Sequence, residues 1–312
     1  LLTGAGIGAA MTLRQVRVSQ DGLHATREQM QHTLETTRQQ LNLTEQGQVT
    51  DRYIRAVEQL GHEKAPVRLG ALYSLEHLAQ DNPGYRQTVV DVVCAYLRMP
   101  YTLPAQPELD AEEVEKSALP AGGRDRASHS APGQDPAREE LQVRQTAQRL
   151  LEFHLRCPPR TSGQEAQLLP PSPQHAFWPG ISLDLTGAIL VGFSFSEVSV
   201  IKVRFVGATF QGGARFVEAT FEGPAEFGQA TFEGPAIFNK ATFEGPAEFG
   251  QATFRGTAWF DEATFQGDAR FGQATFQGDA WFVLATFQGH AGFDQATCRR
   301  RVKTDHLPAV ES

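Results

Sequence analysis

The chain has 312 residues, of which 40 % are hydrophobic, and a formal net charge of −8. Phosphate binding needs a basic face, so this charge argues against direct nucleic-acid binding, and we expect none. Cys94, Cys157 and Cys298 lie far apart and form no CxxC pair and no even disulfide framework, which fits a reducing compartment.

The first 13 residues, LLTGAGIGAAMTL, are small or apolar, and Arg14 and Arg17 follow them. A bilayer-spanning helix needs about 20 apolar residues, so residues 1–13 are predicted to be the end of a transmembrane helix. A buried or frayed helix start is the alternative. The arginines would place the residues after them on the cytoplasmic side of the membrane, which predicts a membrane-associated protein with a cytoplasmic repeat domain.

Residues 14–62 are rich in Gln, Glu, Arg and Thr, with few apolar residues between them, and predict a long polar helix. Met30, Leu34 and Leu41 have a spacing that is compatible with a short coiled-coil seam. A solvated stalk is the alternative to that seam. A homo-oligomer is therefore one open possibility for this protein.

Residues 63–100 carry apolar side chains at helical spacing, interrupted at Asp81-Asn82-Pro83-Gly84, and predict a helical pair. The segment VRLGALYSLEHLAQ looks like one HEAT-type unit. One such unit cannot bury its own faces, so the helix predicted over residues 139–157 is expected to pack on it. Residues 101–138 have little to bury and predict a disordered linker, and residues 158–180 predict a Pro-rich linker.

From Leu185 onward, apolar residues recur at every fifth position, each with a small or apolar partner two positions earlier. Neither a plain strand nor a helix has this period, so the chain is predicted to form short extended segments separated by corners. After Phe210 an 11-residue unit, ATFxGxAxFxx, recurs eight times from Ala208 to about Gln295. The glycine of each unit is expected at a corner, where backbone freedom at positive φ is useful.

Spacing, central Phe, preceding Ala and outward Thr together resemble the pentapeptide-repeat family in its Phe-centred variant. The resemblance implies a right-handed quadrilateral β-helix over residues 181–298, followed by a C-terminal tail at residues 299–312. Two units would form one coil of 22 residues. With TDRYIRAVEQLG ahead of the repeats, the chain is similar to bacterial membrane-associated proteins of that family. The expected fold class is a long helix and a small HEAT-like helical unit followed by a β-solenoid.

The residue at the centre of each repeat is expected to fill the interior of the β-helix, where burial of each Phe contributes about 1.5–3 kcal/mol. Trp259 and Trp281 each precede a central Phe and are expected to point outward as surface contacts, as are Glu226 and Glu248. The expected structural core consists of Leu185, Leu190, Phe195, Phe205, Phe210, Phe216, Phe221, Phe227, Phe232, Phe238, Phe243, Phe249, Phe254, Phe260, Phe265, Phe271, Phe276, Phe282, Phe287 and Phe293.

The sequence contains no GxGxxG, Walker-type, GxSxG or HExxH motif, and a filled rod offers no concave site for catalytic carboxylates. We therefore expect no enzyme, no cofactor and no metal site. The favoured function is a membrane-anchored, non-catalytic interaction scaffold for an unknown protein partner.

The alternative function is a DNA-mimicking inhibitor or protector that acts on a topoisomerase such as DNA gyrase, as the resemblance to acidic pentapeptide-repeat proteins implies. Residues 181–298 carry 13 Asp or Glu against six Lys or Arg, a net charge of −7 that permits this alternative.

Overall fold

A computed structural model describes residues 4–104, 135–158 and 177–304. It divides into two compact units, Leu1–Arg55 and Ala56–Ser312, and each is described by itself. Most of the predicted disordered linker (residues 105–134), most of the Pro-rich linker (159–176), the end of the tail (305–312) and the first three residues lie outside the described residues.

Helix α1 (Gly4–Leu60) is continuous over 57 residues and joins the predicted transmembrane end and the polar segment into one helix. Met30, Leu34 and Leu41 are 66 %, 60 % and 58 % exposed, so the coiled-coil seam stays a prediction. Among the residues that the structure describes, no helix is both long and apolar enough to cross a membrane.

Three further helices form a small bundle, with a 3-10 turn, η1 (Pro83–Tyr85), at the predicted interruption. They are α2 (Ala65–Asp81), α3 (Arg86–Arg98) and α4 (Pro136–Leu155). Helix α4 begins at Pro136 rather than at residue 139, because the Asp135 side chain caps it by accepting a hydrogen bond from the Ala137 N–H. Leu75, Val90 and Val143, one from each helix, are fully buried or nearly so, and the apolar stripes of the three helices meet.

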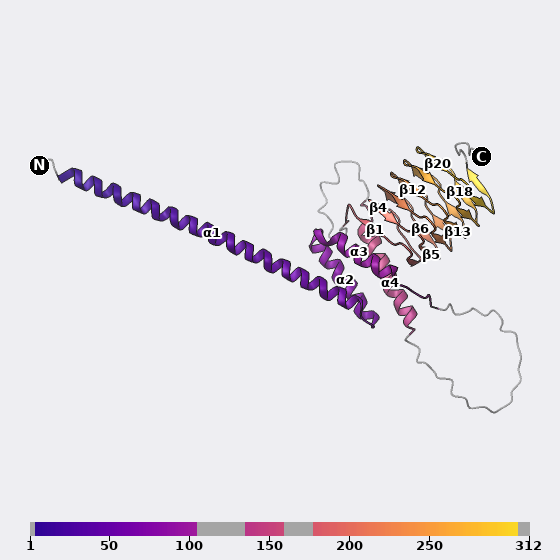
Figure 1. The fold of residues 1–312 in the computed structure, drawn as a ribbon, viewed down its shortest axis with the longest axis horizontal. Coiled ribbons are helices and arrows are strands. Elements are labelled where there is room, and N and C mark those ends of the chain that lie inside the picture. Colours follow the sequence, from indigo (N-terminus) through magenta and orange to yellow (C-terminus); the bar gives the residue numbers. More distant parts are fainter. Residues whose placement is uncertain (1–3, 105–134, 159–176, 305–312) are drawn as a thin grey trace, which may run out of the picture. The chain divides into compact units, whose positions relative to one another are not determined.

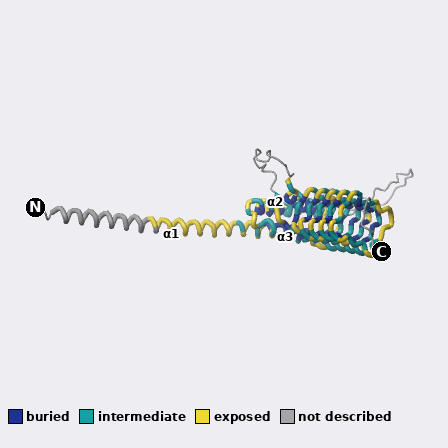
Figure 2. The backbone as a smooth tube through the Cα atoms, turned by 90° about the horizontal axis from the view of Figure 1, so that it is seen from above, coloured by how far each residue is buried: buried dark blue, intermediate teal, exposed yellow. Residues whose placement is uncertain are grey.

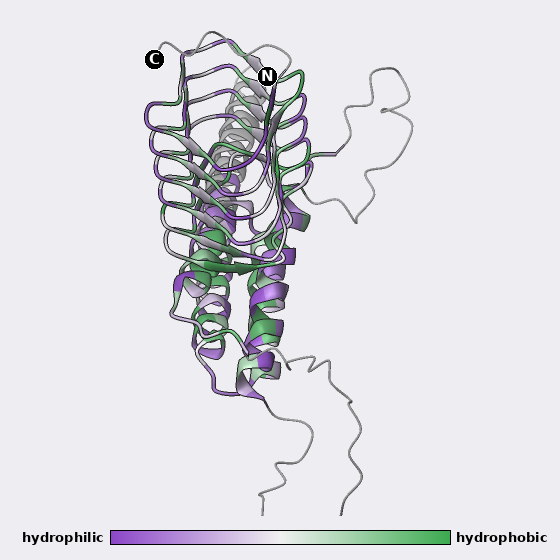
Figure 3. Cartoon of the chain, turned by 90° about the vertical axis from the view of Figure 1, so that its right-hand side faces the viewer, coloured by the Kyte–Doolittle hydropathy of each residue, from purple (hydrophilic) through white to green (hydrophobic). Residues whose placement is uncertain are grey.

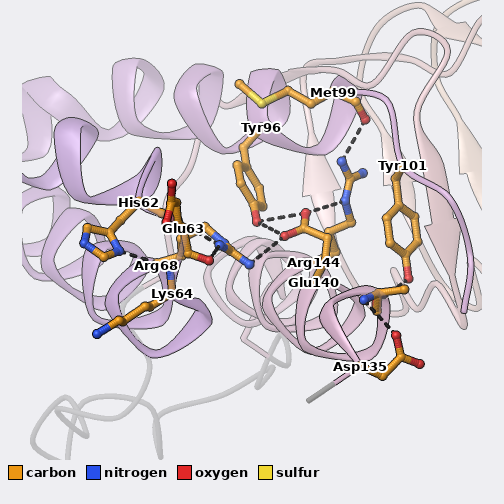
Figure 4. A network of polar contacts seen from close by, with 11 residues as sticks. His62, Glu63, Lys64, Arg68, Tyr96, Met99, Tyr101, Asp135, Glu140 and Arg144 are labelled. Carbon is orange, nitrogen blue, oxygen red and sulfur yellow. Dashed lines mark hydrogen bonds and ion pairs between the residues drawn. The ribbon is translucent and has the colours of Figure 1, made fainter. Parts of the chain in front are cut away.

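A polar network centred on Glu140 ties the three helices together (Figure 4). Its Oε2 accepts a hydrogen bond from the Tyr96 hydroxyl at 2.8 Å and lies 3.0 Å from Arg68, while Oε1 accepts one from Arg144 at 2.8 Å. The Arg144 guanidinium is buried and lies 4.6 Å from the centre of the Tyr101 ring. Burial, followed by the hydrogen bond to Glu140, raises the pKa of Tyr96 well above its ordinary value.

Replacing the central carboxylate of this network should weaken the helical bundle. Glu140→Gln leaves Arg68 and Arg144 without their shared counter-charge, and we expect a loss of about 1–2 kcal/mol in the free energy of unfolding, since Glu140 is partly exposed. Urea denaturation of the full chain would measure it. Glu139→Gln, at the adjacent position, removes the same charge outside the network and should cost less; an equal cost for both variants would contradict the assigned role.

The remaining elements are short parallel strands that stack into a β-solenoid of four faces (Figures 1 and 3). Face 1 contains β1 (Ser182–Asp184), β4 (Lys202–Arg204), β8 (Ala225–Glu226), β12 (Ala247–Glu248), β16 (Ala269–Arg270) and β20 (Ala291–Gly292). Face 2 contains β2 (Ile189–Val191), β5 (Thr209–Gln211), β9 (Thr231–Phe232), β13 (Thr253–Phe254), β17 (Thr275–Phe276) and β21 (Thr297–Cys298). Face 3 contains β6 (Ala214–Arg215), β10 (Ala236–Ile237), β14 (Ala258–Trp259), β18 (Ala280–Phe282) and β22 (Val302–Thr304). Face 4 contains β3 (Ser199–Val200), β7 (Thr220–Phe221), β11 (Thr242–Phe243), β15 (Thr264–Phe265) and β19 (Thr286–Phe287).

The register confirms the predicted coil length. Thr220 pairs with Thr242, and Thr242 pairs with Thr264, so from the second coil onward equivalent residues are 22 positions apart. The first coil is shorter, because Ser182 pairs with Lys202 and Ser199 pairs with Thr220. The ladder also extends into the segment predicted as a tail, because β22 pairs with β18. Residues 299–304 therefore belong to the last described coil.

Central Phe rings stack along the interior of the solenoid, as in the pair Phe232 and Phe254, whose centroids are 4.7 Å apart and whose planes differ by 1°. Buried residues recur in every coil of the solenoid (dark blue in Figure 2). All the residues expected in the core are buried except Phe287 and Phe293, which are half-buried. These two lie in the last described coil, where no described coil covers them.

The glycines of the repeat units differ from the expectation, because among them only Gly212 has a positive φ, of 74°. The left-handed residue is instead the one before each ATF, for example Gln251 with φ 60°. The other glycines are required by the close approach of coils: a Cβ on Gly245 would lie 2.5 Å from the carbonyl carbon of Gly223. At the corners, the residue before each ATF therefore takes the left-handed conformation, and the glycine leaves room for the neighbouring coil.

Candidate interaction surface

The first coil of the solenoid is covered by the helical bundle. The Gln87 side chain of α3 pairs with the Ser182 backbone in both directions: its Nε2 donates to the carbonyl at 2.9 Å, and its Oε1 accepts from the N–H at 3.0 Å. Arg98 forms an ion pair with Asp184 at 2.7 Å. Side chains of α3 thus occupy the edge of β1, where another strand could otherwise pair.

The end of the predicted Pro-rich linker packs against the helical bundle that covers the first coil. Trp178 is buried, its ring stacks on that of His154 with centroids 4.0 Å apart, and its Nε1 donates to Gln80 at 3.0 Å. His154 Nε2 lies 2.8 Å from Glu76. Residues 177–180 are therefore part of the folded structure.

Removing the edge-capping amide should loosen the first coil. Gln87→Ala leaves the N–H and carbonyl of Ser182 unpaired, and we expect a loss of about 1–2 kcal/mol in the free energy of unfolding. Hydrogen exchange of the Ser182 amide should accelerate as well. Gln266→Ala changes an exposed glutamine on face 4 and should do neither; unchanged exchange at Ser182 in Gln87→Ala would contradict the capping role.

Face 3 carries both outward-facing tryptophans of the solenoid, in line with Ile237. Arg215, Ile237, Trp259, Trp281 and Lys303 occupy equivalent positions on β6, β10, β14, β18 and β22 and follow one another in register. Ile237 and both tryptophans are half-buried. The Lys303 ammonium lies 5.3 Å from the centre of the Trp281 ring. We call these five residues the tryptophan row.

Face 1 carries the two glutamates that the sequence singled out. Glu226 and Glu248 are neighbours in register, but Glu226 forms ion pairs with Lys202 at 3.1 Å and Arg204 at 3.0 Å, and Glu248 pairs with Arg270 at 2.7 Å. Partial burial alone would raise the pKa of Glu226, but hydrogen bonds from Lys202 and Arg204 outweigh it and lower that pKa. These carboxylates are therefore already compensated within the solenoid.

The structure does not bring the predicted contact residues together. Faces follow one another along the chain in the order 1, 2, 3, 4, so the glutamates on face 1 and the tryptophans on face 3 are separated by an intervening face on each side. Sequence reasoning missed Ile237, Arg215 and Lys303 as members of the tryptophan row. Reading every second 11-residue unit would have found the first two, because two units form one coil.

The groove on the described surface of the solenoid has few groups that could take part in catalysis. A shallow groove of about 390 Å³ runs along Gln229, Gln251 and Gln273, and Asp294 is its one ionisable lining residue. Within residues 4–104, 135–158 and 177–304, no group of three or more His, Cys, Asp or Glu residues could hold a metal ion.

The comparisons with known proteins agree with this architecture. A family model described as "Pentapeptide repeats (9 copies)" matches residues 205–253 and 249–297. Neither curated proteins nor solved structures gave a match to the chain. Residues 205–297 thus match the pentapeptide-repeat family model, and the 22-residue coils and stacked interior Phe rings of this segment are consistent with that family.

Proposed function

We propose that the protein is a non-catalytic protein–protein interaction scaffold whose contact surface is the tryptophan row on face 3. The observation that carries this proposal is the alignment of Ile237, Trp259 and Trp281 on one sheet, with Arg215 and Lys303 at its ends. Trp and Arg are enriched among residues that dominate binding energy, and a sheet held by stacked coils presents them with little loss of entropy.

Site-specific cross-linking tests the tryptophan row directly. A photoreactive phenylalanine analogue at position 259 of the full chain should cross-link to a discrete partner in cells, whereas the same analogue at position 248 on face 1 should not. Trp281→Ala together with Ile237→Glu should abolish the cross-link from position 259. Equal cross-linking from both faces, or none from position 259, would contradict the proposal.

The scaffold is further proposed to be held at the cytoplasmic side of a membrane through residues 1–13. The apolar stretch LLTGAGIGAAMTL, followed by Arg14 and Arg17, supports this part. The full chain should then remain in the membrane fraction after alkaline carbonate extraction, and a variant without residues 1–13 should move to the supernatant. Recovery of the full chain in the supernatant would refute membrane anchoring. It would not affect the proposal that the tryptophan row is a contact surface.

DNA mimicry is less well supported than the scaffold. A mimic needs carboxylates that are free to replace phosphates, and Glu226 and Glu248 are instead paired with Lys202, Arg204 and Arg270. We expect no inhibition of gyrase supercoiling by the purified full chain. If the chain does inhibit gyrase, and charge reversal at Glu226 and Glu248 removes that inhibition, DNA mimicry would be established.

A further inference from the structure

The two ends of the solenoid differ in how their strand edges are covered. At the first coil, side chains of α3 pair with the edge of β1, and the Cys157 N–H donates to the Glu197 carbonyl at 2.8 Å. At the last described coil, β19, β20, β21 and β22 are edge strands, and Phe287 and Phe293 are half-buried. A row of unpaired backbone groups beside partly exposed core rings is a template for another strand.

The backbone groups at this open end are defined by the coil below. Ala269, Phe271 and Gln273 donate their N–H groups to carbonyls of the next coil at 2.8, 2.7 and 2.7 Å. Their counterparts in the last coil, Ala291, Phe293 and Gln295, lie at the same positions and find no acceptor among the described residues. The open edge of face 1 therefore presents three N–H donors at alternate positions.

The neighbouring edge of face 2 presents carbonyl acceptors where the edge of face 1 presents N–H donors. In the coil below, the Ala274 and Phe276 carbonyls accept hydrogen bonds from Thr297 and Arg299 at 2.8 and 2.9 Å. The equivalent carbonyls of the last coil are those of Ala296 and Cys298. An extended segment that follows the path of a further coil would find donors on face 1 and acceptors on face 2.

The charges at the open end indicate the chemistry of such a segment. Arginines in the inner coils pair with carboxylates of the adjacent coil: Arg255 pairs with Glu233 at 2.6 Å, and Arg270 pairs with Glu248 at 2.7 Å. Arg299, Arg300 and Arg301 are exposed at the last coil, and no ion pair joins them to a described residue.

The last described coil as a whole has an excess of positive charge. Residues 283–304 contain these three arginines and Lys303 against Asp294 alone, whereas residues 181–298 carry a net charge of −7. Because Arg255 and Arg270 each pair with a carboxylate of the adjacent coil, a strand that stacks on the three arginines of the last coil is expected to carry carboxylates.

We propose that the open C-terminal end of the solenoid binds an extended acidic segment of a partner protein by strand addition. The backbone of that segment would pair with the edges of β20 and β21, and its carboxylates would pair with Arg299, Arg300 and Arg301. This mode takes its affinity from backbone hydrogen bonds and its selectivity from side chains. The site adjoins the tryptophan row at Lys303 on β22, but the proposal does not rest on the function proposed for that row.

Fluorescence anisotropy with the full chain tests the proposal, using a labelled peptide that alternates glutamate and valine. The chain should bind it saturably, and should bind a lysine–valine peptide far more weakly. A glutamate–proline peptide keeps the charge but lacks the N–H groups of its prolines, so it should bind about tenfold more weakly than the glutamate–valine peptide. Equal binding of the two acidic peptides would overturn strand addition.

Charge reversal locates the site. Arg299→Glu, Arg300→Glu and Arg301→Glu combined should lower the affinity for the glutamate–valine peptide at least about tenfold. Arg27→Glu, Arg38→Glu and Arg55→Glu combined change the net charge equally at exposed positions of α1 and should leave the affinity within about twofold. Equal losses in the two variants would overturn the assigned site.

Two further outcomes would overturn the choice of occupant. If the full chain does not bind the peptide but a chain that ends at Thr304 does, the chain's own last residues occupy the end. If light scattering shows a dimer that the triple reversal at Arg299, Arg300 and Arg301 dissociates, a second copy occupies it.

Discussion

Gly245→Ala is expected to destabilise the solenoid strongly, although it adds only one methyl group. The new Cβ would lie 2.5, 2.7 and 2.8 Å from the carbonyl carbon, carbonyl oxygen and Cα of Gly223, one coil earlier. These are backbone atoms held by ladders on both sides, so no side-chain rotation can relieve the clash. We expect a loss of about 3 kcal/mol in the free energy of unfolding, at the upper end for overpacked sites.

The chain supplies a matched control for this change. Gly250 also lies in a solenoid corner and has no positive φ, but a Cβ there would approach nothing closer than the Gly272 carbonyl oxygen, at 3.7 Å. Gly250→Ala should therefore change stability by less than about 0.5 kcal/mol. Guanidinium denaturation of the two variants measures the difference. Similar stabilities would show that coils can separate locally without cost, contrary to the close approach assigned to Gly245.

The contrast between these glycines shows where sequence reasoning stops. The period of Phe and Ala predicts the coil, because interior positions must recur wherever the chain returns to the same face. The same period places glycines at corners but does not distinguish a glycine that needs left-handed φ from one that needs room for a neighbouring coil. Gln251 takes the left-handed position, and Gly245 takes the crowded one.

Contacts between residues far apart in the chain are the second feature that could not be predicted from the sequence. That the first coil needs a cover follows from its open edge, but no pattern identifies Gln87 as the residue that pairs with Ser182, since the two belong to different kinds of element. Likewise, Trp259 and Trp281 are recognisable as outward-facing, but their separation from Glu226 and Glu248 becomes clear only when the residues are assigned to faces.

Phe243→Ala in the middle of the solenoid is expected to cost about 3–5 kcal/mol, the range for truncating a buried Phe. The Phe243 side chain is fully buried on face 4, and its ring stacks between those of Phe221 and Phe265 with centroids 4.8 and 4.7 Å apart. Removing it leaves a cavity that the coils above and below cannot fill, since backbone ladders fix their separation.

Phe287 provides the comparison, because it belongs to the same column and stacks on Phe265 at 4.8 Å, but it lies half-buried in the last described coil. Phe287→Ala should therefore cost less than half as much as Phe243→Ala in guanidinium denaturation of the full chain. A solenoid is stabilised through contacts between neighbouring coils, so a defect in the middle interrupts two interfaces and one at the end interrupts a single interface. Equal costs would mean that the last coil is covered as fully as the inner ones, and would count against an open end that is available for a partner strand.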